Sequence, residues 1–257
     1  MNEPYYMAYE KRYQAVFSAG AKRWGHSPYD EVLYNTLKLW VEENNLQGKN
    51  VVEYACGEGA CGVILSELGC VYYGVDISPS AIEKSRELLK NYPNATVEVL
   101  DMVKQRVNGK FDAALDCMGF HMLVTDSDRK LYLKNVFHSL KENAPMLFFR
   151  ESYRRDKTYQ GVVDTVDEWA EITGEDYHTP QLRQIRSDDN GDIKEVLIPL
   201  LPARAKNEDQ YIAEFAEAGF IVNRFVEMGT SSAIPHSATI YVRKKEDSFV
   251  NIRDLQN

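Results

Sequence analysis

The sequence predicts an α/β fold in which helices cover both faces of a mostly parallel, doubly wound sheet. Strand-like apolar runs alternate with helical patterns between residues 50 and 150, and strands separated by helical crossovers lie parallel. The last two strand-like runs, 220–226 and 237–243, are instead joined by a short loop. Two strands joined in that way pair antiparallel, so we expect seven strands that end in an antiparallel hairpin.

The parallel strands are expected at residues 50–56, 71–75, 96–100, 111–116 and 145–150. Helices are expected between them, up to residue 68, from 78 to about 91 and from about 127 to 142. The second of these helices is marked by Ser78-Pro79-Ser80, with Glu83 completing the pattern of a capping box. A later helix over 207–218 ends at Gly219, a residue type that commonly terminates helices.

These patterns divide the chain into four regions. Residues 1–49 are expected to form an N-terminal helical lid, because Tyr5, Tyr9, Tyr13 and Phe17 recur at helical spacing and Ser27-Pro28 opens a second helix. Residues 50–150 and 207–244 form the core, residues 151–206 a substrate-cap insert, and residues 245–257 a C-terminal tail. Within the insert, 182–186 and 193–200 flank Asp188-Asp189-Asn190-Gly191, which predicts a hairpin.

The composition favours a small-molecule or protein substrate over a nucleic acid. The 257 residues carry a formal charge of −9, with a pI near 5.2, whereas nucleic-acid surfaces neutralise phosphates with Lys and Arg. No apolar stretch approaches the roughly 18 residues of a membrane span, and the polar N-terminus lacks a signal-peptide core. The four cysteines show no C-x-x-C spacing, which indicates reduced, buried thiols in a cytoplasmic protein.

Residues 50–76 carry the pattern of a nucleoside-binding site. Gly57 and Gly59 follow the first strand, where glycines let backbone N–H groups approach a ligand closely. Asp76 ends the second strand about 20 positions later, where an acidic side chain can bind the two hydroxyls of a ribose. Because Gly62 follows Gly59, the segment also fits the dinucleotide fingerprint Gly-x-Gly-x-x-Gly.

Four short motifs in order resemble those of the class I S-adenosylmethionine-dependent methyltransferases, whose Rossmann-like sheet has its last strand inserted antiparallel. Glu53-Tyr54-Ala55-Cys56-Gly57-Glu58-Gly59 resembles the first motif of that family, with Ala55 at the position of its first glycine. The resemblance implies further cofactor contacts by the ribose-binding Asp76 with Ile77, by Asp101 and Met102 at the adenine, and by Asp116 beside the reactive methyl group. It also implies that Arg12 and Tyr13 reach the cofactor carboxylate, although the tyrosines fit an apolar helix face as well.

Two other interpretations compete with this one. A nicotinamide-dependent oxidoreductase would use the same glycines, but Glu53 in the approach strand and the final antiparallel hairpin are not typical of it. Glu58 in the turn would also serve a pyrophosphate poorly. A non-catalytic scaffold that binds S-adenosylmethionine stays open, because the pocket residues indicate binding rather than turnover.

His121 and Glu151 are the candidates for proton transfer. His121 lies five residues after Asp116, beside the expected methyl position, and Glu151 directly follows the fifth strand. We expect His121 to act as general base if the acceptor must lose a proton, and Glu151 to orient or deprotonate the acceptor. The alternatives are a packing histidine and a solvated acid. Asp116 and Glu151 are also placed as in metal-dependent catechol-type relatives, but no further carboxylate–amide pair follows, so no metal is expected.

The acceptor is expected to be a small molecule that is methylated at nitrogen, oxygen or sulfur. The segment after Asp116 lacks the prolines of DNA amino-methyltransferases, and no loop with the two glutamates of protein arginine methyltransferases is present. The insert supplies Arg154-Arg155, which would suit an anionic acceptor or form a solvated turn. Its aromatic material, which would suit an aromatic acceptor, is Tyr153, Tyr159, Trp169, Tyr177 and His178. An insert of this size also offers a surface for a homodimer.

Overall fold

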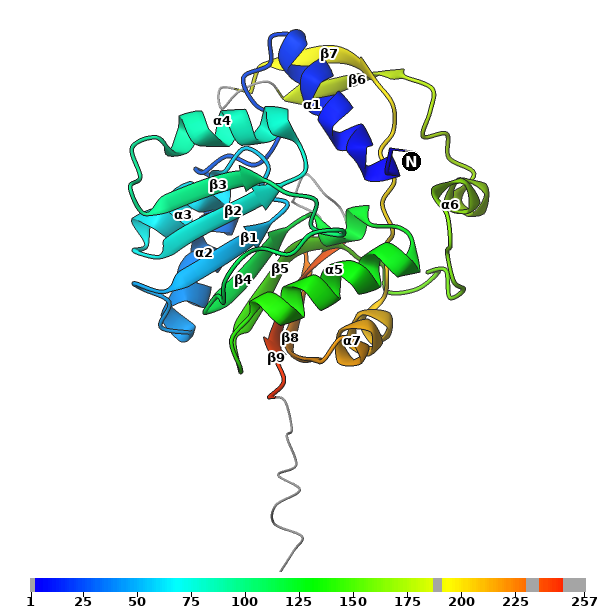
Figure 1. Ribbon diagram of the computed structural model, residues 1–257. Coiled ribbons are helices and arrows are strands. Elements are labelled where there is room, and N and C mark those ends of the chain that lie inside the picture. The colour runs from blue at the N-terminus through cyan, green and yellow to red at the C-terminus, as the bar shows by residue number, and fades with distance from the viewer. Residues whose placement is uncertain (1–2, 187–190, 230–235, 247–257) are drawn as a thin grey trace, which may run out of the picture.

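The computed structural model describes residues 3–186, 191–229 and 236–246, and its main feature is a seven-stranded sheet (Figure 1). The strand order is β3-β2-β1-β4-β5-β9-β8. The strands are β1 (Asn50–Tyr54), β2 (Val71–Asp76), β3 (Ala95–Val99), β4 (Ala113–Cys117), β5 (Pro145–Ser152), β8 (Phe220–Met228) and β9 (Ser237–Lys244). The seven expected strands are confirmed, with ends that differ by a few residues.

The pairing directions also confirm the predicted topology. β1 to β5 pair in parallel, whereas β9 pairs antiparallel with both β5 and β8. The chain leaves β1 toward β2 and β3 on one side, then returns to place β4 and β5 on the other side of β1. Such a reversal opens a crevice at the carboxyl ends of the strands, because the flanking connections diverge there.

Two hydrophobic cores fill the two faces of the sheet. The helices α2 (Glu31–Glu43), α3 (Ala60–Glu67) and α4 (Pro79–Leu89) cover one face, and α5 (Asp126–Ser139) and α7 (Glu208–Glu217) cover the other. Neighbouring strand residues point to opposite faces, so Leu147 belongs to the first core and Phe148 to the second. Burial on both sides explains why β5 reads as a continuous apolar run.

Side-chain caps decide where three of the helices begin. Asp30 accepts a hydrogen bond from the Leu33 amide, so α2 begins at Glu31, later than Ser27-Pro28 predicts. Ser78 caps α4, but the predicted capping box through Ser80 and Glu83 is wrong, since Ser80 lies inside the first turn. A capping box does form at α7, between Asn207 and Gln210.

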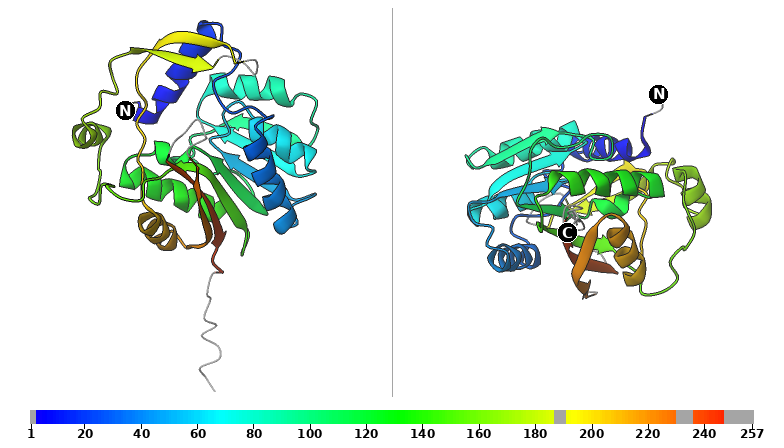
Figure 2. Two further views of the ribbon diagram at one scale, coloured as in Figure 1. Left: turned by 180° about the vertical axis from the view of Figure 1, so that it is seen from behind. Right: turned by 60° about the horizontal axis from the view of Figure 1, so that its bottom comes forward.

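The N-terminal segment and the insert lie across the carboxyl ends of the strands (Figures 1 and 2). The N-terminal segment consists of η1 (Tyr5–Met7) and α1 (Ala8–Ser18). The insert contains the strands β6 (Gln181–Arg186) and β7 (Ile193–Ile198). It also contains the helix α6 (Val166–Thr173), which the sequence patterns did not predict. β6 and β7 pair antiparallel as predicted, although residues 188–190 of the turn lie outside the described residues. Among the described helices, none combines the length and the apolar character needed to cross a bilayer.

Candidate functional site

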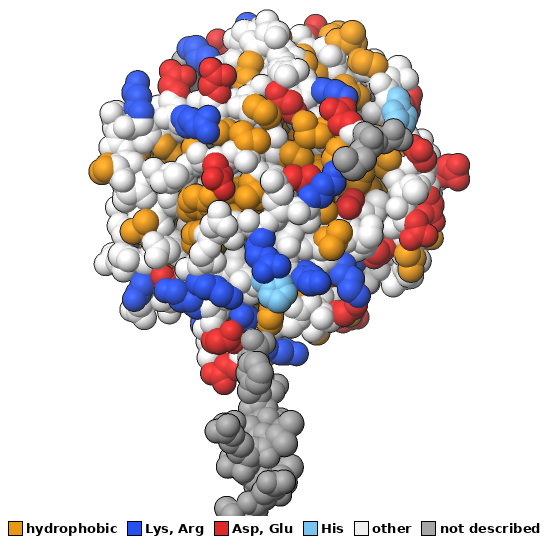
Figure 3. Space-filling view, viewed as in Figure 1, with side chains coloured by type: hydrophobic (Ala, Val, Ile, Leu, Met, Phe, Trp, Pro, Cys, Tyr) orange, Lys and Arg blue, Asp and Glu red, His pale blue; other side chains and the backbone are white. Residues whose placement is uncertain are grey.

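A cavity of about 920 Å³ lies at the carboxyl ends of β1, β2, β4 and β5. Its walls come from residues 6–30, from the strand ends, and from the β6–β7 hairpin. In Figure 3, hydrophobic side chains gather in the upper half of the view, where Figure 1 shows α1 and the hairpin. Crevices at the carboxyl ends of α/β sheets are the usual ligand sites of such folds.

The turn after β1 brings backbone close to the cavity. Gly57 has a φ of 53°, and a β-carbon added there would lie 2.9 Å from the hydroxyl oxygen of Tyr13. The glycine therefore lets Tyr13 cover the turn, and both residues line the cavity. Gly59 does not line it: a β-carbon there would lie 2.4 Å from the Ser85 hydroxyl, so this glycine allows α4 to pack closely.

Ala55, the departure from the first motif, occupies a backbone conformation that glycine favours. Its φ is 53°, and side chains with a β-carbon adopt such a conformation at a free-energy cost. The Ala55 methyl group faces Gly119, where an added β-carbon would lie 2.5 Å away. The absence of a side chain at Gly119 therefore makes room for Ala55 at the cavity wall.

Asp76 ends β2 with its carboxylate beside the Gly57 turn. Its Oδ2 accepts a hydrogen bond from the Gly57 amide and its Oδ1 one from the Ser78 amide, each at 2.8 Å. The residue is buried yet lines the cavity, and burial raises its pKa to about 6. Each carboxylate oxygen keeps a further acceptor position, which is available to a ligand in the cavity.

An apolar slot with one carboxylate continues the cavity past β3. Ile77, Met102, Val103, Met122 and Leu123 line it. Asp101, which also lines the cavity, accepts hydrogen bonds from the Tyr6 hydroxyl at 3.1 Å and from the Val103 amide at 3.0 Å. The structure thus brings Ile77, Asp101 and Met102 to the same end of the cavity as Asp76.

Asp116 shapes the cavity from behind rather than lining it. Its Oδ1 accepts hydrogen bonds from the Gly119 and Phe120 amides, and its Oδ2 accepts one from the Tyr132 hydroxyl at 2.6 Å. The side chain is fully buried, and the residues after it reach the cavity instead. The Asp116 carboxylate is turned into the loop that follows β4, away from the cavity, so its contact with a cofactor stays a prediction that this geometry does not favour.

Arg12 also lies away from the cavity. Its guanidinium carbon sits 4.6 Å from the centre of the Trp24 ring, and burial lowers its pKa. Among the described residues, Arg23 rather than Arg12 lines the cavity near Trp24. The helical spacing placed both Arg12 and Tyr13 on α1, but only Tyr13 faces the strand ends.

His121 and Glu151 contact each other instead of the cavity. His121 Nδ1 lies 2.9 Å from Glu151 Oε2, and the His121 amide donates to the same oxygen at 2.7 Å. Both side chains are buried, and neither lines the cavity. The structure therefore does not place His121 as the general base, nor Glu151 as a group that touches an acceptor, because the pair ties the loop after β4 to β5.

The cavity wall over β4 and β5 carries charged residues that the sequence patterns did not single out. His26 lies before α2, and its Nδ1 is 3.8 Å from Asp30 Oδ2. Burial lowers the pKa of His26, but the Cys117 sulfur and the Asp30 carboxylate outweigh burial and raise it. Arg150 Nη1 lies 3.3 Å from the same Asp30 oxygen. In the sequence, the one feature that could have marked Arg150 as a site residue is its position at a strand end, next to the candidate Glu151.

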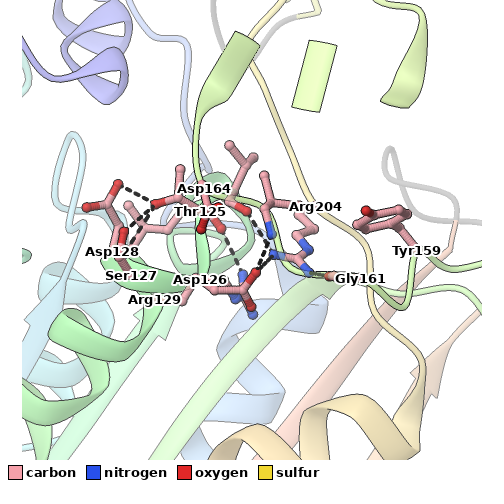
Figure 4. A network of polar contacts seen from close by, with 12 residues as sticks. Thr125, Asp126, Ser127, Asp128, Arg129, Tyr159, Gly161, Asp164 and Arg204 are labelled. Carbon is pink, nitrogen blue, oxygen red and sulfur yellow. Dashed lines mark hydrogen bonds and ion pairs between the residues drawn. The ribbon is translucent and has the colours of Figure 1, made fainter. Parts of the chain in front are cut away.

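The aromatic residues of the insert form a separate cluster. Trp169 and Tyr177 pack with Val163 and Val124, and Arg204 joins this part of the insert to the core (Figure 4). Its Nη1 donates to Asp126 at 2.8 Å and its Nη2 to the Gly161 carbonyl at 3.0 Å. These aromatic residues do not line the cavity, which the insert reaches through the β6–β7 hairpin, so a role for them in acceptor binding stays a prediction.

Neither Arg154 with Arg155 nor Asp116 with Glu151 lines the cavity. Arg154 and Arg155 are exposed, and Arg155 pairs with Glu227 at 2.9 Å. Asp116 and Glu151 each bind other protein groups. Across the described parts of the chain, no group of three His, Cys, Asp or Glu side chains is arranged to hold a metal ion.

A match to a known protein family covers the strand ends that form part of this cavity. Residues 51–143 match the family model of a methyltransferase domain. The chain carries a methyltransferase domain. It contains Gly57, Asp76 and Asp101, and the seven-stranded sheet with its antiparallel strand is the fold of this class.

A curated relative matches part of the chain, and solved structures share its fold. A ubiquinone biosynthesis O-methyltransferase of Coxiella burnetii is 31% identical over 129 residues, which are 48% of this chain and 52% of that protein. An S-adenosylmethionine-dependent methyltransferase of Clostridium acetobutylicum has a TM-score of 0.60 at 16% identity, covering 93% of this chain and 99% of its own. CalS10, an amino pentose methyltransferase of Micromonospora echinaspora, has a TM-score of 0.59 at 16% identity, and the match covers 95% of this chain and 100% of CalS10. The chain spans about half the length, or less, of the curated relatives that it matches.

The residues that match the methyltransferase model form only part of the cavity wall. Tyr13, His26 and Arg150 lie outside the matched residues, as does the β6–β7 hairpin. The N-terminal segment, the end of β5 and the hairpin therefore complete the cavity around the matched strand ends.

Proposed function

We propose that this chain binds S-adenosylmethionine in the cavity and transfers its methyl group to nitrogen, oxygen or sulfur of a small-molecule acceptor. The observation that carries the proposal is the buried Asp76 carboxylate, which faces the cavity beside the Gly57 turn within the methyltransferase domain. CalS10, whose fold is similar, is described with S-adenosylmethionine bound and as acting on an amino pentose.

The residues present fit this cofactor. The free acceptor positions of Asp76 suit ribose hydroxyls, and Ile77 and Met102 offer apolar surface to an adenine beside the Asp101 carboxylate. Glu58 also lines the cavity, and its Oε1 accepts the Trp24 and Gly25 amides at 2.7 and 2.8 Å. A dinucleotide would place its pyrophosphate next to this acid, which disfavours the nicotinamide alternative.

The cofactor, when bound, supplies a methyl group on a sulfonium leaving group, so alignment contributes much of the rate acceleration. The chain's own residues hold the reactants and exclude water. Tyr9, Tyr13 and Trp24 close the cavity from the side of α1. The raised pKa of His26 makes it a poor general base, and its two ring nitrogens face the Met118 sulfur and the Asp30 carboxylate.

A small acceptor agrees with the way the cavity is covered. The N-terminal segment and the hairpin both contribute to its walls, so an acceptor must fit into the part of 920 Å³ that the cofactor leaves. We also infer a homodimer through the insert, since Leu182 and Leu197 of the hairpin are exposed, and a cytoplasmic location, which four free cysteines support.

Calorimetry with S-adenosylhomocysteine, the demethylated cofactor, tests the proposal. The native protein should bind at micromolar concentrations, and Asp76→Ala should weaken binding tenfold or more, because charged hydrogen bonds are lost. Asp167→Ala, at an exposed aspartate of α6, is the control and should bind normally. Absent binding by the native protein, or equal affinity in Asp76→Ala, would overturn the proposal. Transfer of a labelled methyl group to members of a metabolite library then separates an enzyme from a binding scaffold.

A further inference from the structure

The cavity is longer than the nucleoside end requires. Asp101 follows β3 and Arg150 lies near the end of β5, and four strand spacings separate these two strands in the order β3-β2-β1-β4-β5. At about 4.8 Å per spacing, the floor spans roughly 19 Å. Asp76, Asp101 and the Gly57 turn occupy the β1–β3 side, which leaves the side over β4 and β5 for a second ligand.

Arg150 is a buried cationic group at that second end. It is 5% exposed and lines the cavity. Its Nη1 lies 3.3 Å from Asp30 Oδ2, and its Nε is buried without a hydrogen-bond partner. A guanidinium has five N–H donors, and the Asp30 contact engages only Nη1, so donors of Arg150 remain for a ligand in the cavity.

The backbone of β5 is distorted where it presents this side chain. Phe148 pairs with Ile240 and Glu151 with Ala238, so two residues of β5 oppose the single Thr239 of β9. Arg150, the second of the two, has a φ of 56°. Bulges of this kind redirect side chains and occur next to functional sites. Here the bulge directs a cation to the cavity, where a regular strand would continue its pairing.

We propose that Arg150 binds the methyl acceptor and that the acceptor is a monocarboxylate with an apolar body. The proposal rests on the function proposed above and names the substrate class of the same site. A guanidinium matches a carboxylate through two parallel hydrogen bonds. Asp30 already offsets part of the Arg150 charge, which favours a single negative charge over a phosphate dianion. Met118 and Ile185 line the cavity and provide apolar surface for the rest of the molecule.

The remaining charged neighbours fit a monoanion. His26 and Cys117 face the same end of the cavity. Cys61 and, to a lesser extent, His26 lower the pKa of Cys117, while Cys117 raises the pKa of His26 against the effect of burial. An imidazolium and a thiolate at this end carry opposite charges and add no net charge. The carboxylate of the acceptor binds Arg150 and takes no part in the reaction. The nucleophilic atom of the acceptor would lie over β4, between Arg150 and the Gly57 turn.

The experiment measures binding to protein saturated with S-adenosylhomocysteine. The probes are butyrate, octanoate and phenylacetate, each with its neutral amide, together with phenyl phosphate. We expect at least one carboxylate to bind tenfold or more tightly than its amide, and Arg150→Met to abolish that preference. Arg150→Lys should retain part of it, since the charge remains without the planar fork. Arg155→Met, at an exposed arginine paired with Glu227, should change nothing.

The affinity for S-adenosylhomocysteine itself reports folding and separates the two proposals. It should stay within twofold of native in Arg150→Met. A parallel loss of S-adenosylhomocysteine binding in Arg150→Met and Arg150→Lys would assign Arg150 to the cofactor and overturn the inference. Equal binding of carboxylates and amides, a preference that persists in Arg150→Met, or tighter binding of phenyl phosphate would overturn it too. If the native protein does not bind S-adenosylhomocysteine, it is the proposed function that fails.

Discussion

Asp76 is buried and is the residue proposed to bind the ribose, so its ionisation should control cofactor affinity. Burial raises the pKa of Asp76 to about 6, and the ionised carboxylate is the better acceptor for ribose hydroxyls. Affinity should therefore be level above about pH 7 and weaken as the pH falls through 6, because protons compete with the ligand. Calorimetry with S-adenosylhomocysteine between pH 5 and 8 measures this. Asp76→Asn should bind weakly with a flatter profile, and an unchanged slope in that variant would contradict the assignment.

At the scale of elements, one buried ion pair joins α5 to α7. Arg129 is fully buried, and its Nε and Nη2 each donate to Glu214 at 2.7 Å. Nη1 donates to the Phe120 and Leu123 carbonyls, in the segment that lines the cavity. Glu214→Ala should lower the free energy of unfolding by about 3–5 kcal/mol, since it leaves a buried guanidinium without its carboxylate. Urea denaturation measures the loss.

The same two helices supply the matched control for that prediction. Lys130 and Glu217 form an exposed pair, also at 2.7 Å, and exposed pairs contribute little. Glu217→Ala should therefore leave the urea midpoint almost unchanged. In Arg129→Met combined with Glu214→Leu, we expect a smaller loss than in Glu214→Ala, because the buried guanidinium is removed together with its carboxylate and only Lys206, 3.1 Å from Glu214, loses its partner. Equal losses in Glu214→Ala and Glu217→Ala would contradict the role given to the buried pair.

At the scale of the whole molecule, α1 is held over the cavity by a polar contact with the core. Glu10 accepts hydrogen bonds from the Ser78 hydroxyl, the Ser80 hydroxyl and the Ser80 amide, at the start of α4. Removing these bonds in Glu10→Ala should lower the cost of opening α1 by about 2 kcal/mol. Amide exchange across residues 8–18 should then be roughly 30-fold faster, as measured by hydrogen–deuterium exchange.

Lys11→Ala tests whether that effect is specific to the contact. Lys11 is the next residue on α1, is mostly exposed and pairs with Glu3, so its loss should not change exchange across α1. Bound S-adenosylhomocysteine should protect residues 8–18 in the native protein, because Tyr9 and Tyr13 line the cavity. Equal exchange rates in Glu10→Ala and Lys11→Ala would show that other contacts hold α1.

Much of the fold and the nucleoside end of the site follow from local patterns. Alternating strand and helix signals, the Gly57 turn and an acid at the end of β2 are each contained in one short segment. Parallel topology then brings strand ends to one edge of the sheet. The structure accordingly agrees with the predicted strands, and places Asp76, Asp101 and Met102 at one cavity. The capping box at Ser80 failed because the neighbouring Ser78 caps the helix instead.

The acceptor end depends on contacts between segments far apart in the chain. His121 is turned away by Glu151, 30 residues later, Asp30 joins His26 to Arg150, and a bulge against β9 redirects Arg150. A one-residue change in pairing reverses the direction of a side chain at a strand end, and no pattern within one segment records it. Length, periodicity and glycines were enough for the nucleoside end, whereas only the packed tertiary structure decides which side chains meet the acceptor.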